Sequence, residues 1–322
     1  MKNVLFFLSM VFIASWIAIL GCKKSNNSAS PSTPLGQLFT GIASTPQNFT
    51  VIAGRDTVIY GTDSTMLHFY ANSFKDATGN TITNKFINIQ LTEMYKPGEM
   101  IRNRATTITT DGNMLQSGGE INIVATMNGQ EVFANKYGVG FKQSSMSSVT
   151  MSLYYSNGSS DSAISWTIGN TNGDKGTVAY GTIRDTTHFI DHNSCFFVFD
   201  SCTHFNYTNC DNGVFPLPRI SYIRFTLPDN SFNIGNTEMF LNLTTASMVL
   251  RIDFSKDSLG YLYNFAENPP LGYNYELIAI SNKNGGYYYF EQSGVTTDQM
   301  TINVALAPET RGDIISRLSG LR

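Results

Sequence analysis

Six side chains that could bind a metal or form disulfides lie close together in the middle of the chain. They are His188, His192, Cys195, Cys202, His204 and Cys210. Imidazole and thiolate are good zinc ligands, and four of the six could complete a tetrahedral site. The segment has no C-x2-C element, however, and Phe196–Phe199 indicates a strand. In an oxidising compartment the default for such cysteines is a disulfide, and three pairings are open. We therefore expect a disulfide, no metal and no cofactor.

Recognisable catalytic motifs are absent from the sequence. There is no G-x-S-x-G nucleophile elbow, no H-E-x-x-H zinc helix and no G-x4-G-K-[ST] phosphate loop. Glycosidase carboxylates leave no short motif, so Glu93, Glu120, Asp200 and Asp253 are the candidates for such a pair. Nothing in their spacing selects two of them. The sequence favours a protein that is not an enzyme, with a glycan hydrolase as the weaker alternative.

Consecutive aromatic residues near the C-terminus are the best lead to a binding surface. Tyr287, Tyr288 and Tyr289 precede Phe290 in a predicted strand, so about half of these side chains must point away from the core face. Exposed aromatic faces bind sugar rings or protein partners, because each carries apolar area and a polar tip. The competing interpretation is burial against a C-terminal helix or the first domain.

The N-terminal stretch predicts the cellular location of the protein. Lys2 precedes an apolar run from Val4 to Leu20, which has the length of a signal-peptide core. Ile19-Leu20-Gly21-Cys22 resembles the lipobox of bacterial lipoproteins, although that family prefers Leu at the position of Ile19 and a small residue at that of Leu20. The resemblance implies cleavage after Gly21, lipidation of Cys22 and an anchor in the bacterial envelope, with the outer membrane as the expected site. An uncleaved anchor helix is the alternative.

Composition narrows the class of partner. Residues 22–36 are rich in Ser, Asn and Pro and predict a flexible tether. Charged residues make up 14% of the chain, against an average of about 25%. The net charge of −3 provides no basic field for phosphate backbones, so a nucleic-acid partner is not expected.

Residues 37–143 predict an all-β domain. Ile87, Ile89 and Leu91 alternate with polar residues, and Ile121, Ile123 and Ala125 repeat the pattern. Asn128-Gly129 is typical of a hairpin turn. No stretch here has a helical period, so a β-sandwich is expected.

Three segments of this domain, in the same order along the chain, resemble a module of exported bacterial lipoproteins. They are Tyr70-Ala-Asn-Ser-Phe74, Asn88-Ile-Gln-Leu-Thr-Glu93 and Thr110-Asp-Gly-Asn-Met-Leu-Gln-Ser-Gly-Gly-Glu-Ile121. The module is similar to ZU5-like or immunoglobulin-like sandwiches, and its family is largely uncharacterised. We interpret Leu115–Gly119 as a strand-connecting turn. Phe205-Asn-Tyr-Thr-Asn-Cys-Asp211 is similar to a segment of the same group, which implies that Cys210 is a buried free thiol and that Cys195 pairs with Cys202 across a tight hairpin.

Residues 144–308 predict a second sandwich that carries the Cys/His segment as an irregular insert. Strand patterns resume after Arg219, and Asn284-Gly285 predicts a hairpin. Pro269-Pro270-Leu-Gly-Tyr273 resembles the strand entry of transthyretin-like sandwiches. In residues 309–322, Ile314, Ile315, Leu318 and Leu321 form one helical stripe, which we expect to be the only appreciable helix of the mature chain.

These features together predict a lipid-anchored envelope protein of two β-sandwiches that binds a glycan or a protein. A structural accessory subunit of an outer-membrane complex is the second hypothesis, and a hydrolase with an unrecognised carboxylate pair is the third.

Overall fold

The computed structural model describes residues 33–143, 151–156, 158, 164–169, 177–179, 195–213, 218–252, 255–256, 261–263 and 268–321. The chain divides into two compact units, Met1–Ser30 and Pro31–Arg322, and all described residues lie in the second. The predicted signal peptide, Cys22, His188 and His192 lie outside the described residues. Within the described part, no helix is both long and apolar enough to span a membrane.

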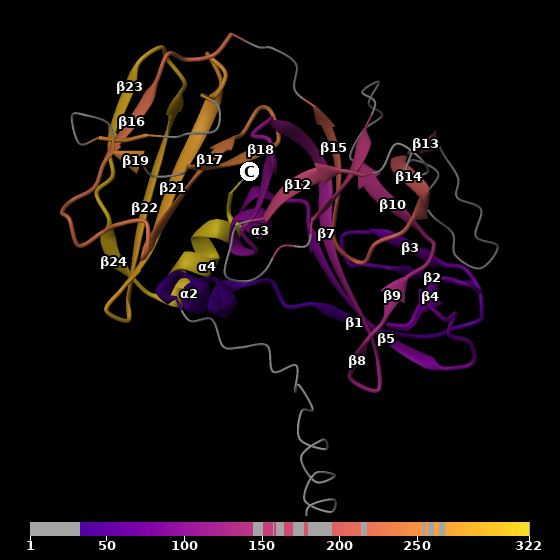
Figure 1. Cartoon of the computed structure of the whole chain (residues 1–322). Helices are drawn as coiled ribbons and strands as arrows, with labels where there is room; N and C mark the ends of the chain where they lie inside the picture. The colour runs from indigo at the N-terminus through magenta and orange to yellow at the C-terminus, as the bar shows by residue number, and fades with distance from the viewer. Residues whose placement is uncertain are drawn as a thin grey trace, which may run out of the picture. The chain divides into compact units, whose positions relative to one another are not determined.

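Two sheets form the first sandwich (Figure 1). Sheet 1 has the order β1-β5-β7-β15-β11-β12-β6, with β8 paired to β7. Its strands are β1 Gln47–Ile52, β5 Phe86–Met94, β6 Ala105–Thr109, β7 Leu115–Met127, β8 Gln130–Glu131, β11 Ser152–Ser156, β12 Ile164–Ile168 and β15 Asn206–Gly213. Sheet 2 has the order β13-β14-β10-β3-β2, formed by β2 Thr57–Tyr60, β3 Met66–Phe69, β10 Tyr137–Gln143, β13 Thr177–Ala179 and β14 Cys195–Cys202. The short strands β4 Phe74–Lys75 and β9 Phe133–Ala134 pair separately.

A second sandwich follows after Arg219. Sheet 3 has the order β19-β20-β16-β23, formed by β16 Ile223–Thr226, β19 Ser255–Lys256, β20 Leu262–Tyr263 and β23 Met300–Asn303. Sheet 4 has the order β18-β17-β21-β22-β24, formed by β17 Thr237–Leu243, β18 Met248–Ile252, β21 Asn274–Lys283, β22 Gly286–Val295 and β24 Ala307–Glu309. The all-β class, the two sandwiches and the C-terminal helix are thus confirmed.

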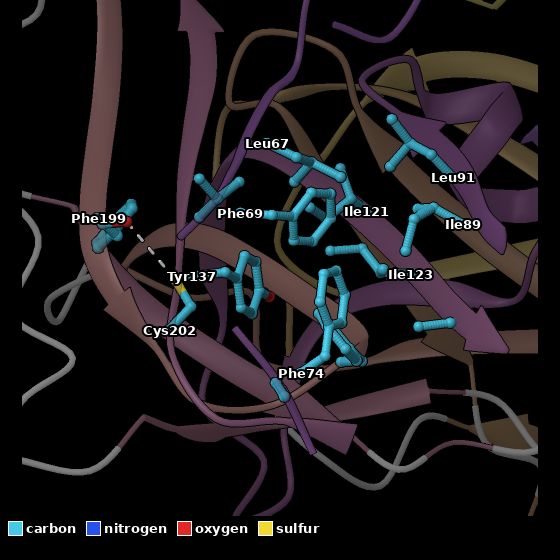
Figure 2. Packing of buried hydrophobic residues seen from close by; sticks show 14 of the residues in the cluster. Leu67, Phe69, Phe74, Ile89, Leu91, Ile121, Ile123, Tyr137, Phe199 and Cys202 are labelled. Atoms are coloured by element: carbon cyan, nitrogen blue, oxygen red, sulfur yellow. Dashed lines mark hydrogen bonds between the residues drawn. The ribbon is translucent and has the colours of Figure 1, made fainter. Parts of the chain in front are cut away.

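Alternating apolar residues place one core inside each sandwich. Figure 2 shows the first, where Ile89, Leu91, Ile121 and Ile123 of sheet 1 face Phe69 of sheet 2. The second core joins residues such as Phe225 and Ile302 to Leu241 and Leu277 of the facing sheet. Burial of these alternating faces is the main force that holds each pair of sheets together.

The predicted domain boundary at residues 143/144 is wrong. β15 lies between β7 and β11 in the middle of sheet 1, and β14 pairs with β10 in sheet 2. The first sandwich therefore extends to Gly213, and the described part of the Cys/His segment, from Cys195 to Cys210, belongs to it rather than to the second. The sequence order could not show this, because the partners of β14 and β15 lie far away along the chain.

Three short helices fill the space between the two sandwiches: α2 Pro34–Ile42, α3 Pro97–Arg102 and α4 Arg311–Ser319. The four apolar residues of α2 that pack there are Leu35, Leu38, Phe39 and Ile42. The buried side chains of Ile314, Leu318 and Leu321 confirm the predicted C-terminal stripe. A third core joins these residues to sheet 1 through Trp166 and to sheet 4 through Phe240.

Helix α2 corrects two expectations, since it begins inside the predicted tether and α4 is not the only appreciable helix. Thr33 is the N-cap, and its hydroxyl accepts a hydrogen bond from the Gly36 N–H at 3.0 Å. Pro34 follows as the first helical residue, where its missing N–H costs nothing. The Thr-Pro pair looked like part of a Pro-rich tether, but it starts the helix.

Candidate functional site: a cleft between the sandwiches

A cleft of about 480 Å³ opens between the two sandwiches, within the size range of ligand pockets. The first sandwich contributes Asp63, Tyr95, Lys96, Pro97, Met100, Ser117, Gly118, Gly119, Lys142 and Gln143. The second contributes Asn242, Thr244, Ser247 and Val249, and Leu321 adds an apolar contact. Sites formed between two packed units are common places for ligands.

A β-bulge shapes the wall of this cleft. Asn209 pairs with Glu120 and Asp211 pairs with Ser117, so Gly118 and Gly119 of β7 together oppose the single residue Cys210. The interpretation of this segment as a strand-connecting turn is therefore wrong, because Leu115–Met127 is one continuous strand. A Gly-Gly pair is typical of both turns and bulges.

Both glycines of the bulge are required by close contacts. Gly119 has a φ of +130°, and a Cβ there would lie 2.4 Å from the Tyr95 ring. A Cβ on Gly118 would lie 2.9 Å from the carbonyl oxygen of Cys210. The Gly118 carbonyl accepts a hydrogen bond from Gln143 Nε2 at 2.7 Å. The absence of a side chain at Gly119 thus leaves room for the Tyr95 ring at the wall of the cleft.

Hydrogen bonds hold the polar groups of the cleft in place. The Ser117 N–H donates to the Ser247 carbonyl at 3.1 Å, which joins β7 to the β17–β18 turn across the cleft. Asn242 Nδ2 donates to Glu276 Oε2 at 2.8 Å. Tyr95 Oη lies 2.9 Å from Thr65 Oγ1, and burial raises the pKa of Tyr95, so the phenol stays neutral. The cleft is therefore preformed rather than assembled from mobile loops.

The rim of the cleft carries more positive than negative charge. Two lysines, Lys96 and Lys142, line the cleft together with one acid, Asp63, and both lysines are exposed. Lys142 Nζ lies 3.4 Å from Ser64 Oγ. The interior mixes hydroxyl and amide groups with the apolar side chains of Pro97 and Met100. Such a lining can hydrogen-bond a polar ligand that also has apolar faces.

The candidate glycosidase carboxylates do not meet in this cleft. Glu93 accepts hydrogen bonds from the Thr65 and Asp63 N–H groups, each at 2.9 Å, and from Gln47 Nε2 at 2.7 Å, so it fixes the β2–β3 loop. Glu120 is fully buried, and Asp200 is exposed on β14. Asp253 lies outside the described residues. The three described acids, Glu93, Glu120 and Asp200, therefore offer no pair of carboxylates to a substrate in the cleft.

The aromatic residues of β22 pack mostly inward, as the burial interpretation proposed. Tyr289 is buried, its hydroxyl donates to Glu291 Oε2 at 2.9 Å, and Arg317 of α4 lies over its ring. Tyr287 packs against the core between the sandwiches. Tyr288 packs edge-on against Phe232, with a centroid distance of 5.2 Å. These tyrosines are separate from the cleft residues.

The predicted Cys195–Cys202 disulfide is wrong. The two residues stand at opposite ends of the single strand β14, paired with Gln143 and Tyr137 of β10. Seven residue steps in a strand separate the two Cα atoms by about 23 Å, far beyond disulfide reach. The apolar run Phe196–Phe199 indicated strand β14 correctly. The tight hairpin predicted between Cys195 and Cys202 is absent, because both residues belong to that one strand.

The remaining members of the Cys/His segment are dispersed. Cys202 and Cys210 are buried in the first core, and the Cys202 thiol lies 3.7 Å from the Phe199 carbonyl oxygen (Figure 2). Cys210 is a buried free thiol, as the family resemblance implied, and burial raises its pKa well above the usual value. His204 lies in a loop and packs against Tyr155. Within the described ranges, no group of three His, Cys, Asp or Glu side chains is placed to hold a metal.

Comparison with known proteins does not assign the chain to a family. No family model matches its sequence, and no curated protein matches it significantly. The residues that form the cleft were missed by sequence reasoning, apart from the glycine pair. They come from six separate stretches of chain, and only the Gly118-Gly119 pair gave a local signal.

Proposed function

We propose that this protein is a lipid-anchored, non-enzymatic component of the bacterial cell envelope that binds a glycan. The observation that carries the proposal is the preformed cleft, whose walls come from both sandwiches. The lipobox-like Ile19–Cys22 segment supports the anchored location. An anchor with a tether, and a cleft whose described lining contains one acid, Asp63, fits a binding protein better than a hydrolase.

The chemistry of the lining favours a glycan. A sugar ring presents hydroxyl groups at its edge and C–H groups on its faces, and the cleft offers partners for both. Ser247, Thr244 and Gln143 can exchange hydrogen bonds with hydroxyls, while Tyr95 and Pro97 provide apolar contact. The two rim lysines add attraction for sugars that carry a carboxylate or phosphate.

The experiment that tests the cleft is substitution of Thr244 by Trp. The indole fills the space between the sandwiches, so we expect the Kd for a bound polysaccharide to rise by at least about tenfold, equivalent to about 1.4 kcal/mol. Binding is measured by calorimetry, after a screen of purified envelope and plant polysaccharides identifies a ligand.

Thr245→Trp is the matched control, because Thr245 is an exposed neighbour in the same turn and does not line the cleft. It should leave affinity unchanged. Equal weakening by both variants, or a screen without any bound polysaccharide, contradicts the glycan proposal.

Anchoring is tested separately at Cys22. Replacement by Ala removes the thiol that would carry the lipid, so we expect complete loss of lipid labelling and of membrane association. Metabolic labelling with a fatty acid and membrane fractionation measure both. Wild-type processing of Cys22→Ala would contradict the anchor. Cys210→Ala is the control, because its thiol is buried in the first core and should carry no lipid.

A further inference from the structure

A rigid turn in the second sandwich presents an apolar side chain to solvent. Ile234 lies in the loop between β16 and β17 and is 66% exposed. The Asn233 N–H donates to Asn236 Oδ1, and the Gly235 N–H donates to Asn233 Oδ1, each at 2.9 Å. Asn236 Nδ2 donates to the Ser231 carbonyl at 2.8 Å. Ile234 therefore cannot fold back onto the core without breaking these bonds.

Aromatic side chains and a lysine lie beside this turn. Lys283 Nζ is 4.2 Å from the ring centroid of Phe232 and 5.7 Å from that of Tyr288, and both Lys283 and Tyr288 are half-buried. Hydrogen bonds from Ser231, and to a lesser degree the charge of Lys283, lower the pKa of Asp229. The charges of Lys283 and Asp229 offset each other, so this surface acts through apolar and aromatic contact.

Asn282 ties the turn to the start of helix α2. Its N–H donates to the Asn236 carbonyl at 2.9 Å, and its Nδ2 donates to the Pro34 carbonyl at 2.9 Å. Ile234 is two residues from Asn236, and Thr33 directly precedes Pro34. Ile234 and Thr33 therefore lie at the same end of the second sandwich, and Figure 1 shows α2 at the end where β24 lies.

The chain between the predicted lipidation site and α2 is short. Eleven residue steps separate Cys22 from Thr33, so the covalent chain between them reaches at most about 36–40 Å. A lipid on Cys22 would hold Thr33 within this distance of the bilayer. A short tether keeps two surfaces at an effective concentration of about millimolar, so a single apolar contact that is too weak for a free protein becomes populated.

We propose that the turn with Ile234, together with Tyr288, docks on the lipid surface of the membrane that carries the anchor and so orients the protein. This inference rests on the lipid anchor proposed at Cys22. Ile234 supplies apolar area to the bilayer interface. Tyr288 and Lys283 combine an apolar body with a polar tip, as residues at membrane–water interfaces do.

This orientation holds the ligand cleft away from the membrane. Strand β17 begins at Thr237, next to the docking turn, and its six residue steps to Leu243 span about 20 Å. Thr244 and Ser247, which line the cleft, lie beyond that far end of β17. The cleft would therefore open toward ligands outside the bilayer rather than toward lipid.

Quenching of tryptophan fluorescence by brominated lipid tests the docking surface. Trp166 is the only tryptophan after Cys22 and is buried, so the wild-type chain gives the background. The lipidated full chain is reconstituted into vesicles of phosphatidylethanolamine and phosphatidylglycerol that contain brominated phosphatidylcholine. We expect Ile234→Trp to lose fluorescence relative to the same protein in vesicles without bromine, and its emission to shift to the blue.

Leu271→Trp is the matched control, because Leu271 is also exposed, at 43%, but lies at the other end of β21. The eight residue steps from Asn274 to Asn282 separate the two ends by about 27 Å. The control should show no quenching. Equal quenching of both variants, or none in either, overturns the docking surface.

A reporter at Tyr288 links the contact to Ile234 itself. Tyr288→Trp should be quenched, and adding Ile234→Asp should abolish that quenching, because a carboxylate opposes entry into the lipid interface. Quenching that survives Ile234→Asp contradicts the proposal. Fatty-acid labelling of the same preparation separates the two failures. A labelled chain without quenching overturns the docking surface alone, whereas an unlabelled chain overturns the anchor and this inference together.

Discussion

Replacement of Arg104 by Met is expected to lower the free energy of unfolding by about 3–5 kcal/mol, because it leaves a buried carboxylate without its main partner. Arg104 Nη2 lies 2.9 Å from Glu238 Oε2, and both side chains are less than a tenth exposed. The pair joins the turn after α3 in the first sandwich to β17 in the second. Arg251 Nη1 lies further away, 3.8 Å from Glu238 Oε1, and is partly exposed, so it compensates only in part.

Urea unfolding followed by circular dichroism measures this loss. Lys96→Met is the matched control, because Lys96 pairs with Glu99 at 3.8 Å on the surface and is 62% exposed. Exposed pairs of this kind contribute about 0–1 kcal/mol. Similar losses in the two variants would show that the buried pair does not hold the sandwiches together.

Replacement of Gly98 by Ala is expected to cost about 3 kcal/mol through displacement of helix α4. A Cβ on Gly98 would lie 1.7 Å from the carbonyl oxygen of Leu318. The contact atom belongs to the backbone, so no side-chain rotation can relieve the clash. Helices α3 and α4 must separate, which exposes the apolar residues that both place between the sandwiches.

The loss of α4 packing can be measured by amide hydrogen exchange, where Ile314–Ser319 should exchange faster, together with a lower Tm. Gly312→Ala is the control, because the first neighbour of its Cβ is Thr310 Oγ1 at 3.8 Å. That change should be neutral or stabilise α4 by up to about 1 kcal/mol. Unchanged protection of α4 in Gly98→Ala contradicts the expectation.

Local patterns in the sequence predicted much of the strand content. The alternation of Ile87, Ile89 and Leu91 is the inward face of β5, and Asn284-Gly285 forms the predicted turn between β21 and β22 with φ values of 54° and 78°. Both signals arise from neighbouring residues. The prediction of the C-terminal helix was also correct, because its signal is local: Ile314 and Leu318 are one helical turn apart.

Features that depend on distant residues were not predictable in this way. The parallel pairing of β12 with β6, and the insertion of β15 beside β7, join segments separated by long stretches of chain. The burial of Glu120 depends on that insertion, because its cross-strand neighbour Asn209 belongs to β15. A strand-borne acid such as Glu120 looks the same in sequence whether it is solvated or fully buried.

The position of β15 in the middle of sheet 1 also has a consequence for how the chain folds. Until residues 206–213 have been synthesised, β7 lacks its neighbour on one side and presents an unpaired edge. The closing contacts of the first sandwich therefore have high sequence separation, which slows folding. A fragment that stops at Gln143, the boundary that the sequence suggested, should populate a partly open sheet that associates with other copies through β7. The smallest piece able to close the first sandwich ends after Gly213.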